Sequence, residues 1–433
     1  MMSNKNKPLE AVLLGAGGRG IYTHGAYAKE HPDQLKFVAV AELQEDRRKK
    51  FAEIHGIPES RQFASYQELF DAEKLAPMCF NTTMDLQHLD SSLMAINKGY
   101  DLFLEKPIDV TPQGVLKIFN AAVQNKCIVQ ICHPLRYTPF YSKIKDLIDS
   151  KAIGKVLSII MEENVCYWHF AHSFVRGNWG VVSKSGPVIL TKTCHDMDLA
   201  VWLSDSEPKS IMSMGFQLMF VKANQPEGAT KRCTDGCPHV GKCPFDAISM
   251  YLTDNVEWPV SAIALDTSLE ARRKALETGP YGRCAFDCDN TALDEQNVLV
   301  EFENGIQFIF GMHANTMNPT RTIRVLGTEG EIDGTLETDD INLYRFNPGF
   351  NYNVASTKVH EDEKIIESDG HHGGDSGAIN QFIDLVRTRN YDKAWASLKI
   401  ATDSHLLSFA SEESRKQKQT VVMSEYLKTV KVN

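Results

Sequence analysis

The chain has 433 residues, of which 42% are hydrophobic and 24% are charged, a composition typical of a globular protein with two or three domains. Its formal net charge of −10 argues against nucleic-acid binding, because neutralising phosphates requires a basic face. No apolar run reaches the roughly 18 residues that a membrane span needs, and the start, MMSNKNKPLE, lacks a signal-peptide pattern. We therefore expect a cytoplasmic protein with no membrane partner, whose ten cysteines are mostly reduced.

The first third of the chain alternates apolar runs with helical patterns. The runs are AVLLGAG at 11–17, FVAVAEL at 37–43, MCFNTT at 78–83, DLFLEKP at 101–107 and CIVQIC at 127–132. Strands that alternate with helices form parallel sheets through right-handed crossovers. The sequence therefore predicts an α/β fold whose residues 1–145 form a Rossmann domain with a doubly wound parallel sheet.

The pattern changes after about residue 150. GKVLSIIMEENV at 154–165 predicts a long strand, PVILT at 187–191 a buried strand and HDMDLAVWL at 195–203 a helix. QNVLVEFENGIQFIFGMHA at 296–314 predicts a hairpin with Asn304-Gly305 as a two-residue turn. Short strands at 322–336 and 341–346 and two helices after about 374 follow. We expect residues 146–433 to form an α+β domain on a mainly antiparallel open sheet, with an insertion at about 222–294.

A glycine-rich turn follows the first predicted strand and opens a helix. In LLGAGGRGIY, Gly15, Gly17 and Gly20 satisfy GxGxxG; glycines let a pyrophosphate approach the backbone, and the helix N-terminus attracts its charge. Glu42 ends the second predicted strand, where a carboxylate accepts hydrogen bonds from ribose hydroxyls and repels a 2′-phosphate. The pattern predicts dinucleotide binding with NAD favoured over NADP. The loop residues Gly18 and Arg19 belong to the same site, and Arg19 or Arg47 could instead bind a 2′-phosphate.

The fourth apolar run ends in a charged pair followed by proline. Glu105 and Lys106 precede Pro107, whose ring fixes its own φ and restricts the residue before it. We therefore expect Lys106 to be a cation on a rigid backbone at the end of a buried strand.

The ordered motifs resemble the glucose–fructose oxidoreductase/inositol dehydrogenase (Gfo/Idh/MocA) family. They are GAGGRG, VAVAE, NTTMDLQH at 81–88, LEKP at 104–107, HPLRYTPFY at 133–141 and CHDMDL at 194–199. The resemblance implies that Lys106 lies beside the nicotinamide and the substrate, and that His195 with Asp198 faces it from the second domain. It extends the cofactor site to Asn81, Thr82, His88 and Glu105, and implies a homodimer or homotetramer formed through the open sheet.

One departure from that family bears on the proton acceptor. Members similar to inositol dehydrogenase usually place an aspartate four residues before the histidine, where this chain has Thr191, followed by Lys192. Histidine titrates near neutral pH, so His195 is the favoured base. A desolvated lysine could also act as base, which leaves Lys192 and Lys106 as alternatives. A histidine on an apolar helix can also be purely structural.

An aromatic and histidine-rich segment, ENVCYWHFAHSFVRGNW at 163–179, suits the apolar faces and hydroxyls of a sugar, although such segments also pack cores. The candidate substrate residues are Arg136, Tyr167, Trp168, His169, His172, Arg176, Trp179 and Asp198. The GHHGGD run at 370–375 predicts a cap for a helix that begins near Ser376, and His371 or His372 could reach the pocket.

Five cysteines cluster in the insertion. They are Cys233, Cys237, Cys243, Cys284 and Cys288. Four thiolates can close a structural zinc site, but C-x3-C-x5-C is looser than the C-x2-C of zinc knuckles, and the C-x2-C-x2-C run of iron–sulfur proteins is missing. A structural metal, free thiols and disulfides remain as three alternatives, and nothing indicates a catalytic metal.

The sequence thus predicts an NAD-dependent oxidoreductase that acts on a secondary hydroxyl or keto group of a sugar, a polyol or a derivative. A related alternative is a glycosidase that oxidises a sugar transiently and then eliminates a substituent. A third is a regulator that senses NAD without catalysis. Such regulators typically lack the EKP lysine or the histidine, whereas Lys106 and His195 are both present.

Overall fold

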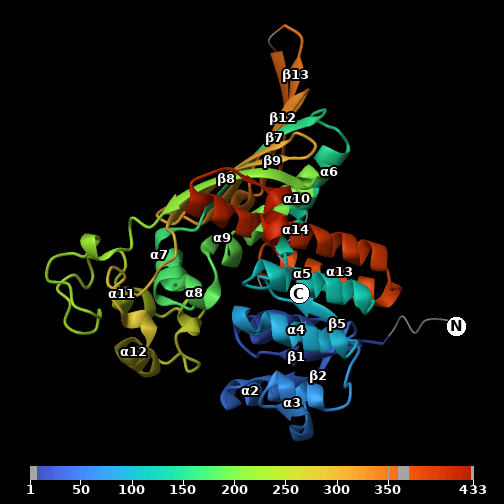
Figure 1. Ribbon diagram of the computed structural model, residues 1–433. Helices are drawn as coiled ribbons and strands as arrows, with labels where there is room; N and C mark the ends of the chain where they lie inside the picture. The colour runs from blue at the N-terminus through green and yellow to red at the C-terminus, as the bar shows by residue number, and fades with distance from the viewer. Residues whose placement is uncertain (1–6, 350, 359–369, 431–433) are drawn as a thin grey trace.

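The computed structural model of the protein describes residues 7–349, 351–358 and 370–430. Two sheets organise this part of the chain, one of six strands and one of nine (Figure 1). The six-stranded sheet is parallel and belongs to the N-terminal part, whereas the nine-stranded sheet is mainly antiparallel. The predicted fold class, a Rossmann sheet followed by an α+β domain on an open sheet, is confirmed.

The six-stranded sheet has the order β3-β2-β1-β4-β5-β6, with every neighbouring pair parallel. Its strands are β1 (Leu9–Leu14), β2 (Leu35–Ala41), β3 (Gln62–Phe63), β4 (Met78–Asn81), β5 (Asp101–Leu104) and β6 (Val129–Ile131). Most residues of these strands are buried, although both residues of the short edge strand β3 are half-buried. The order reverses between β1 and β4, and ligands of such sheets bind at the carboxyl ends of the strands around that point.

Helices cover both faces of this sheet. They are α1 (Ala26–Glu30), preceded by a wider turn at Gly20–Gly25, and α2 (Glu45–His55), α3 (Tyr66–Asp71), α4 (His88–Asn97) and α5 (Pro112–Gln124). Helix α13 (Gly374–Thr388) returns from the far end of the sequence, and its Ile379 and Phe382 share an apolar cluster with Phe80 and Phe103 of the sheet. The chain therefore completes its first core with residues from its C-terminal part.

The nine-stranded sheet has the order β14-β13-β12-β11-β7-β10-β9-β8-β15. Its strands are β7 (Val156–Asn164), β8 (Pro208–Phe216), β9 (Glu295–Phe302), β10 (Gln307–His313), β11 (Thr320–Gly327), β12 (Gly330–Thr335), β13 (Asp340–Asn347), β14 (Asn351–Lys358) and β15 (Val421–Val422). β7 and β10 pair in parallel, and the other neighbours are antiparallel.

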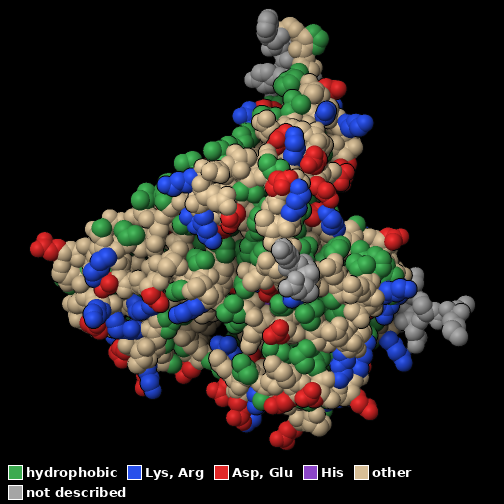
Figure 2. Space-filling view, viewed as in Figure 1, with side chains coloured by type: hydrophobic (Ala, Val, Ile, Leu, Met, Phe, Trp, Pro, Cys, Tyr) green, Lys and Arg blue, Asp and Glu red, His purple; other side chains and the backbone are tan. Residues whose placement is uncertain are grey.

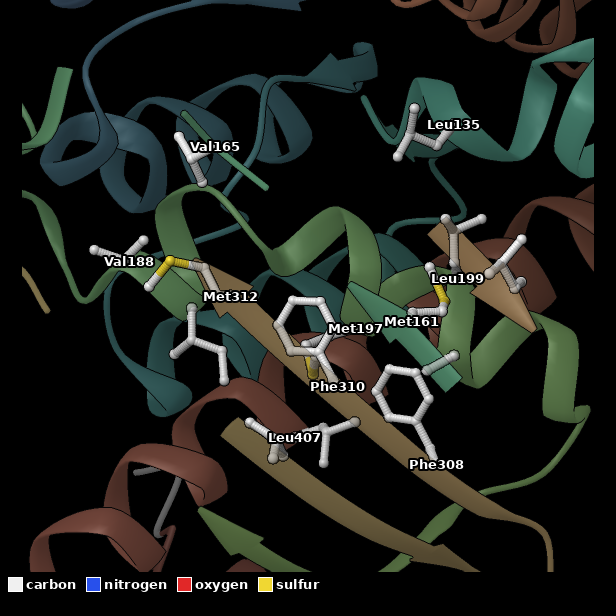
Figure 3. Packing of buried hydrophobic residues seen from close by; sticks show 14 of the residues in the cluster. Leu135, Met161, Val165, Val188, Met197, Leu199, Phe308, Phe310, Met312 and Leu407 are labelled. Carbon is white, nitrogen blue, oxygen red and sulfur yellow. The ribbon is translucent and has the colours of Figure 1, made fainter. Parts of the chain in front are cut away.

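Two helices, α10 (Cys194–Ser204) and α14 (Tyr391–Gln417), cover one face of the nine-stranded sheet. Figure 3 shows Phe308 and Phe310 of β10 pointing toward Met197 of α10, with Leu407 of α14 close by. The alternation of buried and exposed residues along β8, β9 and β11 leaves the other face of the sheet uncovered within the described chain.

Two local predictions are wrong. PVILT forms the short helix α9 (Val188–Thr191) rather than a strand, because the Thr191 and Lys192 amides bond back to Pro187 and Val188 while the apolar side chains enter the core. The β9–β10 turn has three residues rather than two: Phe302 pairs with Ile306, and Gly305 adopts φ 85°. A left-handed glycine after a type I turn is the usual form of a three-residue hairpin loop.

The segment between β8 and β9 forms a separate lobe beside α7 (Tyr167–Phe170), on the left in Figure 1. It contains α11 (Ala247–Tyr251) and α12 (Leu269–Thr278), and Ala247, Tyr251, Val260 and Leu276 form its own small core. The remaining helices are α6 (Pro139–Asp149), α8 (Val182–Ser185) and α15 (Met423–Thr429). Within the described ranges, we find no helix with the length and apolar character needed to cross a bilayer.

Candidate active site

The glycine turn lies at the carboxyl end of β1, at the reversal of the strand order. A Cβ atom on Gly15, which has φ +83°, would meet the Thr82 carbonyl oxygen at 2.6 Å, and one on Gly20 would meet the Gly15 carbonyl oxygen at 2.4 Å. These two glycines are required by the fold itself. By contrast, a Cβ atom on Gly17 or Gly18 would meet no atom of the described residues within 4 Å. The loop therefore leaves open space in front of a helix N-terminus, which fits a dinucleotide pyrophosphate.

Glu42 lies beside this turn, just beyond the end of β2. Its carboxylate accepts hydrogen bonds from the Ala16 amide at 2.7 Å and the Gln44 amide at 2.8 Å. Arg48, which sequence reasoning missed, donates to the Glu42 carbonyl oxygen at 2.6 Å. The acidic side chain is thus held where an adenosine ribose would lie, and the position fits NAD. Arg47, the second candidate for a 2′-phosphate, is half-buried on the following helix α2.

Arg19, the other candidate for a 2′-phosphate, pairs with two carboxylates of the protein. Its guanidinium bonds Glu105 at 2.7 Å and Asp375 of α13 at 2.7 and 3.0 Å, and His24 completes the network with a 2.8 Å contact to Glu105. Burial alone would raise the pKa of Asp375, but Arg19 holds it well below its usual range. Arg19 and Glu105 therefore join the glycine turn, the EKP segment and α13 rather than presenting charge to a 2′-phosphate.

Three other predicted cofactor residues hold the turns around the glycine loop and Lys106 through hydrogen bonds. Thr82 donates through its hydroxyl to the carbonyl oxygens of Leu14 and Gly15. Asn81 is buried and bonds Ser91, at 2.8 Å, and Ser92. His88 contacts the Pro107 carbonyl oxygen at 2.6 Å and the Thr83 carbonyl oxygen at 3.0 Å. These contacts brace the ends of β4 and β5, so Asn81 and His88 hold the turns that carry Thr82 and Lys106.

Lys106 leaves the end of β5 and reaches the second domain. Its Nζ donates to the Thr191 carbonyl oxygen at 2.6 Å and lies 5.8 Å from the centre of the Trp179 ring. The Lys106–Pro107 peptide bond is cis. Trp179 in turn donates to the Asp85 carboxylate at 2.9 Å. The lysine thus touches the residue next to Lys192, so the EKP segment and the TKTCHD segment meet.

His195 lies at the start of α10 and faces two other histidines. Its Nδ1 is 3.4 Å from Nδ1 of His133, and its ring centre is 5.8 Å from that of His371. Behind His133, the Asp198 carboxylate lies 3.6 Å away and accepts hydrogen bonds from Nε and Nη2 of Arg136. Burial, followed by the charges of His133 and Lys106, lowers the pKa of His195 well below 6.5. The imidazole is therefore neutral at pH 7.

Lys192 belongs to a buried charge cluster. Its Nζ lies 3.2 Å from Glu163 of β7, and Arg321 of β11 pairs with Glu163 at 2.6 Å and with Asp196 at 3.1 Å. Burial lowers the pKa of Lys192 and raises that of Asp196 to about 7. Since a charged lysine is stabilised by the adjacent carboxylate, the pairing with Glu163 favours an ammonium at this position over a free base.

The predicted substrate residues fall into three groups. Trp179 and His169 lie on the Lys106 side of the site, and the charge of Lys192 adds to the burial that lowers the pKa of His169 well below 6.5. Arg136 and Asp198 are buried and satisfy each other behind the histidines. A third group points to the insertion lobe: Tyr167 packs on Phe245, Trp168 on Trp258, His172 bonds Tyr251, and Arg176 bonds two backbone carbonyls.

The insertion brings four of its five cysteines, all with free thiols, to one cavity; they are Cys233, Cys237, Cys243 and Cys284. The disulfide alternative is therefore wrong for this structure.

The GHHGGD run lies beside the candidate site. His371 contacts His195 and Asp375. The run precedes a helix as predicted, although α13 begins at Gly374 instead of Ser376.

Sequence reasoning missed Glu163 and Arg321, although the strand pattern carried a signal. Glu163 lies two and four residues from the buried Met161 and Ile159, on the same face of β7. Arg321 lies on the same face of β11 as the buried Ile323 and Val325. Alternate residues of a strand face the same side, so each charge occupies an inward position. Opposite charges at inward positions of two strands predict a buried ion pair.

Together, the glycine turn, the acid after β2 and the lysine that meets a second-domain histidine segment define a two-domain dinucleotide-binding oxidoreductase. The family model described as "Oxidoreductase family, NAD-binding Rossmann fold" matches residues 9–133, and the model described as "GFO/IDH/MocA C-terminal domain" matches residues 141–231. The chain belongs to the Gfo/Idh/MocA family of NAD-binding oxidoreductases.

Similar proteins agree with this assignment. YteT of Bacillus subtilis is 27% identical over 292 residues, 66% of each chain. Inositol 2-dehydrogenase of Salmonella typhimurium is 26% identical over 204 residues, 47% of this chain and 56% of the relative. These matches span less than two thirds of the relatives' lengths. The solved levoglucosan dehydrogenase complex with NADH shares the fold, with a TM-score of 0.69, 16% identity and coverage of 96% and 99% of the two chains.

Proposed function

We propose that the protein is an NAD-dependent dehydrogenase that interconverts a secondary hydroxyl and a keto group on a sugar, a polyol or a related compound. The observation that carries this proposal is the 2.6 Å contact from Lys106 to Thr191, since it brings a Rossmann-domain cation beside the segment that holds Lys192 and His195. The relatives named inositol 2-dehydrogenase and levoglucosan dehydrogenase support the substrate class.

NAD, when bound, accepts a hydride from the carbon that carries the hydroxyl. Of the chain's own residues, His195 is neutral at pH 7 and can take the hydroxyl proton at an imidazole nitrogen. Lys106 supplies a positive charge for the oxygen as that proton leaves. His133, Asp198 and Arg136 act as positioning residues that orient the imidazole from behind.

The direct test is to incubate the protein with NAD and a panel of polyols, sugars and glycosides, and to follow the absorbance of reduced nicotinamide together with aglycone release. The proposal predicts reduction of NAD by a polyol or sugar without aglycone release. Release without net reduction would support the eliminating glycosidase, which the similar proteins named above do not favour. Tight NAD binding with neither activity would identify a regulator.

The position of Glu42 predicts the cofactor preference. We expect the unaltered protein to bind NADH more tightly than NADPH, because the carboxylate repels a 2′-phosphate. A Glu42→Gln variant should weaken NADH binding by about tenfold, the loss of a charge-assisted hydrogen bond of about 1.4 kcal/mol. Fluorescence titration with both cofactors measures this. A Glu68→Gln variant, on the exposed face of α3, is the control, and tighter binding of NADPH by the unaltered protein would contradict the prediction.

We also propose a homo-oligomer formed through the uncovered face of the nine-stranded sheet. Met212, Leu299 and Ile309 form an exposed apolar row across β8, β9 and β10, and Figure 2 shows hydrophobic side chains gathered along this edge of the molecule. Apolar patches of this kind on a folded chain mark association surfaces.

A charge placed on this face tests the proposal. Met214 of β8 is 66% exposed, and Met214→Asp should shift the protein to a smaller species in light scattering coupled to gel filtration, since a buried unpaired charge disfavours the interface. Leu269→Asp, at an exposed position of α12 in the insertion lobe, should leave the mass unchanged. A monomeric unaltered protein would overturn the proposal.

A further inference from the structure

The cavity in the insertion lobe is walled by cysteines from two segments that pair through their backbones. Cys233 donates its amide to the Gly282 carbonyl oxygen at 2.9 Å, and Cys284 donates its amide to the Lys231 carbonyl oxygen at 2.8 Å. Cys237 and Cys243 line the same cavity from the loop that leads into α11. Free thiols from two paired segments that converge on one space are the arrangement of thiolate metal centres.

Two of the sulfurs already accept hydrogen bonds from nitrogen donors. The Ala247 amide lies 3.4 Å from Cys233 Sγ, and Gln225 Nε2 lies 3.5 Å from Cys284 Sγ. N–H donors directed at sulfur stabilise the thiolate form and tune metal sites from outside the ligand set. Cys288 differs, because it does not line the cavity and its thiol donates to the Cys284 carbonyl oxygen at 3.2 Å.

A buried cation faces the same cavity, and no carboxylate of the described residues forms an ion pair with it. Arg176 is 1% exposed, and it donates to the carbonyl oxygens of Arg283, at 2.7 Å, and Phe245, at 2.5 Å. Its Nη1 atom is buried and has no hydrogen-bond partner within the part of the chain that the structure describes. Burying a charge without a counter-charge is costly. Asp246 also lines the cavity, but its carboxylate accepts hydrogen bonds from its own loop and from α11. Four thiolates around a metal carry a net negative charge, which would add a counter-charge beside the guanidinium.

From these three observations we propose that Cys233, Cys237, Cys243 and Cys284 bind a thiolate-ligated metal centre whose charge is balanced by Arg176. Four thiolates can hold either a single zinc ion or an iron–sulfur cluster. Among the described residues, no three of these sulfurs lie within 4.8 Å of one another, so the thiolates would have to move closer together to share a single zinc ion.

The metal centre would hold the segment at 167–179, which would form one wall of the proposed substrate site. Arg176 links the cavity to the segment at 167–179, and α11 follows Cys243 and carries Tyr251, which bonds His172 at 2.8 Å. Trp258 of the lobe packs on His169 with ring centres 4.9 Å apart. Loss of the metal should therefore loosen this wall. That consequence rests on the proposed dehydrogenase function, whereas metal binding itself does not.

The test is to purify the full chain without oxygen and to measure iron, acid-labile sulfide and zinc per chain. We expect a stoichiometric metal at this site, either iron together with acid-labile sulfide or zinc alone. Cys284→Ser should lose the metal, whereas Cys288→Ser should keep it. Unaltered protein without stoichiometric iron or zinc, or a Cys284→Ser variant that keeps the metal, would overturn the proposal.

NADH titration separates a lost centre from a misfolded chain. Cys284→Ser should bind NADH as the unaltered protein does, because the Rossmann sheet has its own core. If Cys284→Ser fails to fold, the metal content of unaltered protein and of Cys288→Ser still decides the matter. A substrate KM that rises more than kcat falls would support the link between the metal centre and the segment at 167–179. Metal-loaded protein with no dehydrogenase activity would overturn only the proposed function.

Discussion

Replacing Lys106 with methionine should lower kcat/KM by about 10³-fold, the loss expected when a positioned charge no longer stabilises a developing oxyanion. Methionine keeps the length and apolar stem of the side chain but removes the ammonium group that contacts Thr191 and faces Trp179. Steady-state kinetics with the polyol or sugar identified in the panel measures the effect. NADH binding should persist, because the glycine turn and Glu42 are unchanged.

The matched control is Lys143→Met, on the exposed face of α6. It removes the same charge and should leave both kinetic constants unchanged. A Lys106→Met enzyme that retains full turnover would show that the contact between the two domains has no part in the chemistry.

The His195→Asn variant should lose about 10²–10⁴-fold in kcat, the usual contribution of a positioned general base. Asparagine retains a polar side chain against His133 but cannot take a proton at neutral pH. His31→Asn, on the loop after α1, is the control and should behave as the unaltered enzyme. If Lys192 is the base instead, His195→Asn would keep most of its turnover and Lys192→Gln would lose it.

The lowered pKa of His195 predicts how kcat/KM and the free energy of unfolding depend on pH. Burial and the charges of His133 and Lys106 lower the pKa of His195 well below 6.5, so the acid limb of kcat/KM should begin below pH 6.5. The unfolded chain binds this proton more tightly than the folded protein, so the free energy of unfolding should fall as pH drops below about 6.5. This group contributes at most about 1.4 kcal/mol per pH unit. Chemical denaturation of the unaltered protein and His195→Asn between pH 5 and 7 would show whether the slope depends on His195.

Much of the site could be predicted because its signals are local. The backbone around the turn requires glycine at positions 15 and 20, because a Cβ atom on Gly15 or Gly20 would meet a backbone oxygen. Lys106 and His195 each lie in a short motif at the end of a regular element. By contrast, nothing near Arg136 or Arg176 in the sequence indicates that the first would pair with Asp198 and the second would face a cysteine cavity.

By itself, the sequence determined the alternation of strands and helices, the glycine turn, the acid after β2 and the order of the motifs. All of these depend on residues that are neighbours along the chain, where backbone sterics and hydrophobic periodicity act. Only the tertiary structure decided that PVILT becomes a helical turn, that Arg321 joins Glu163 to Asp196, and that α13 completes the Rossmann core. The charge pairs of Arg321 and the packing of α13 join segments far apart in sequence, and burial of the PVILT side chains in the core accompanies their local helical hydrogen bonds. Such packing and pairing energies exist only once the chain has brought the segments together.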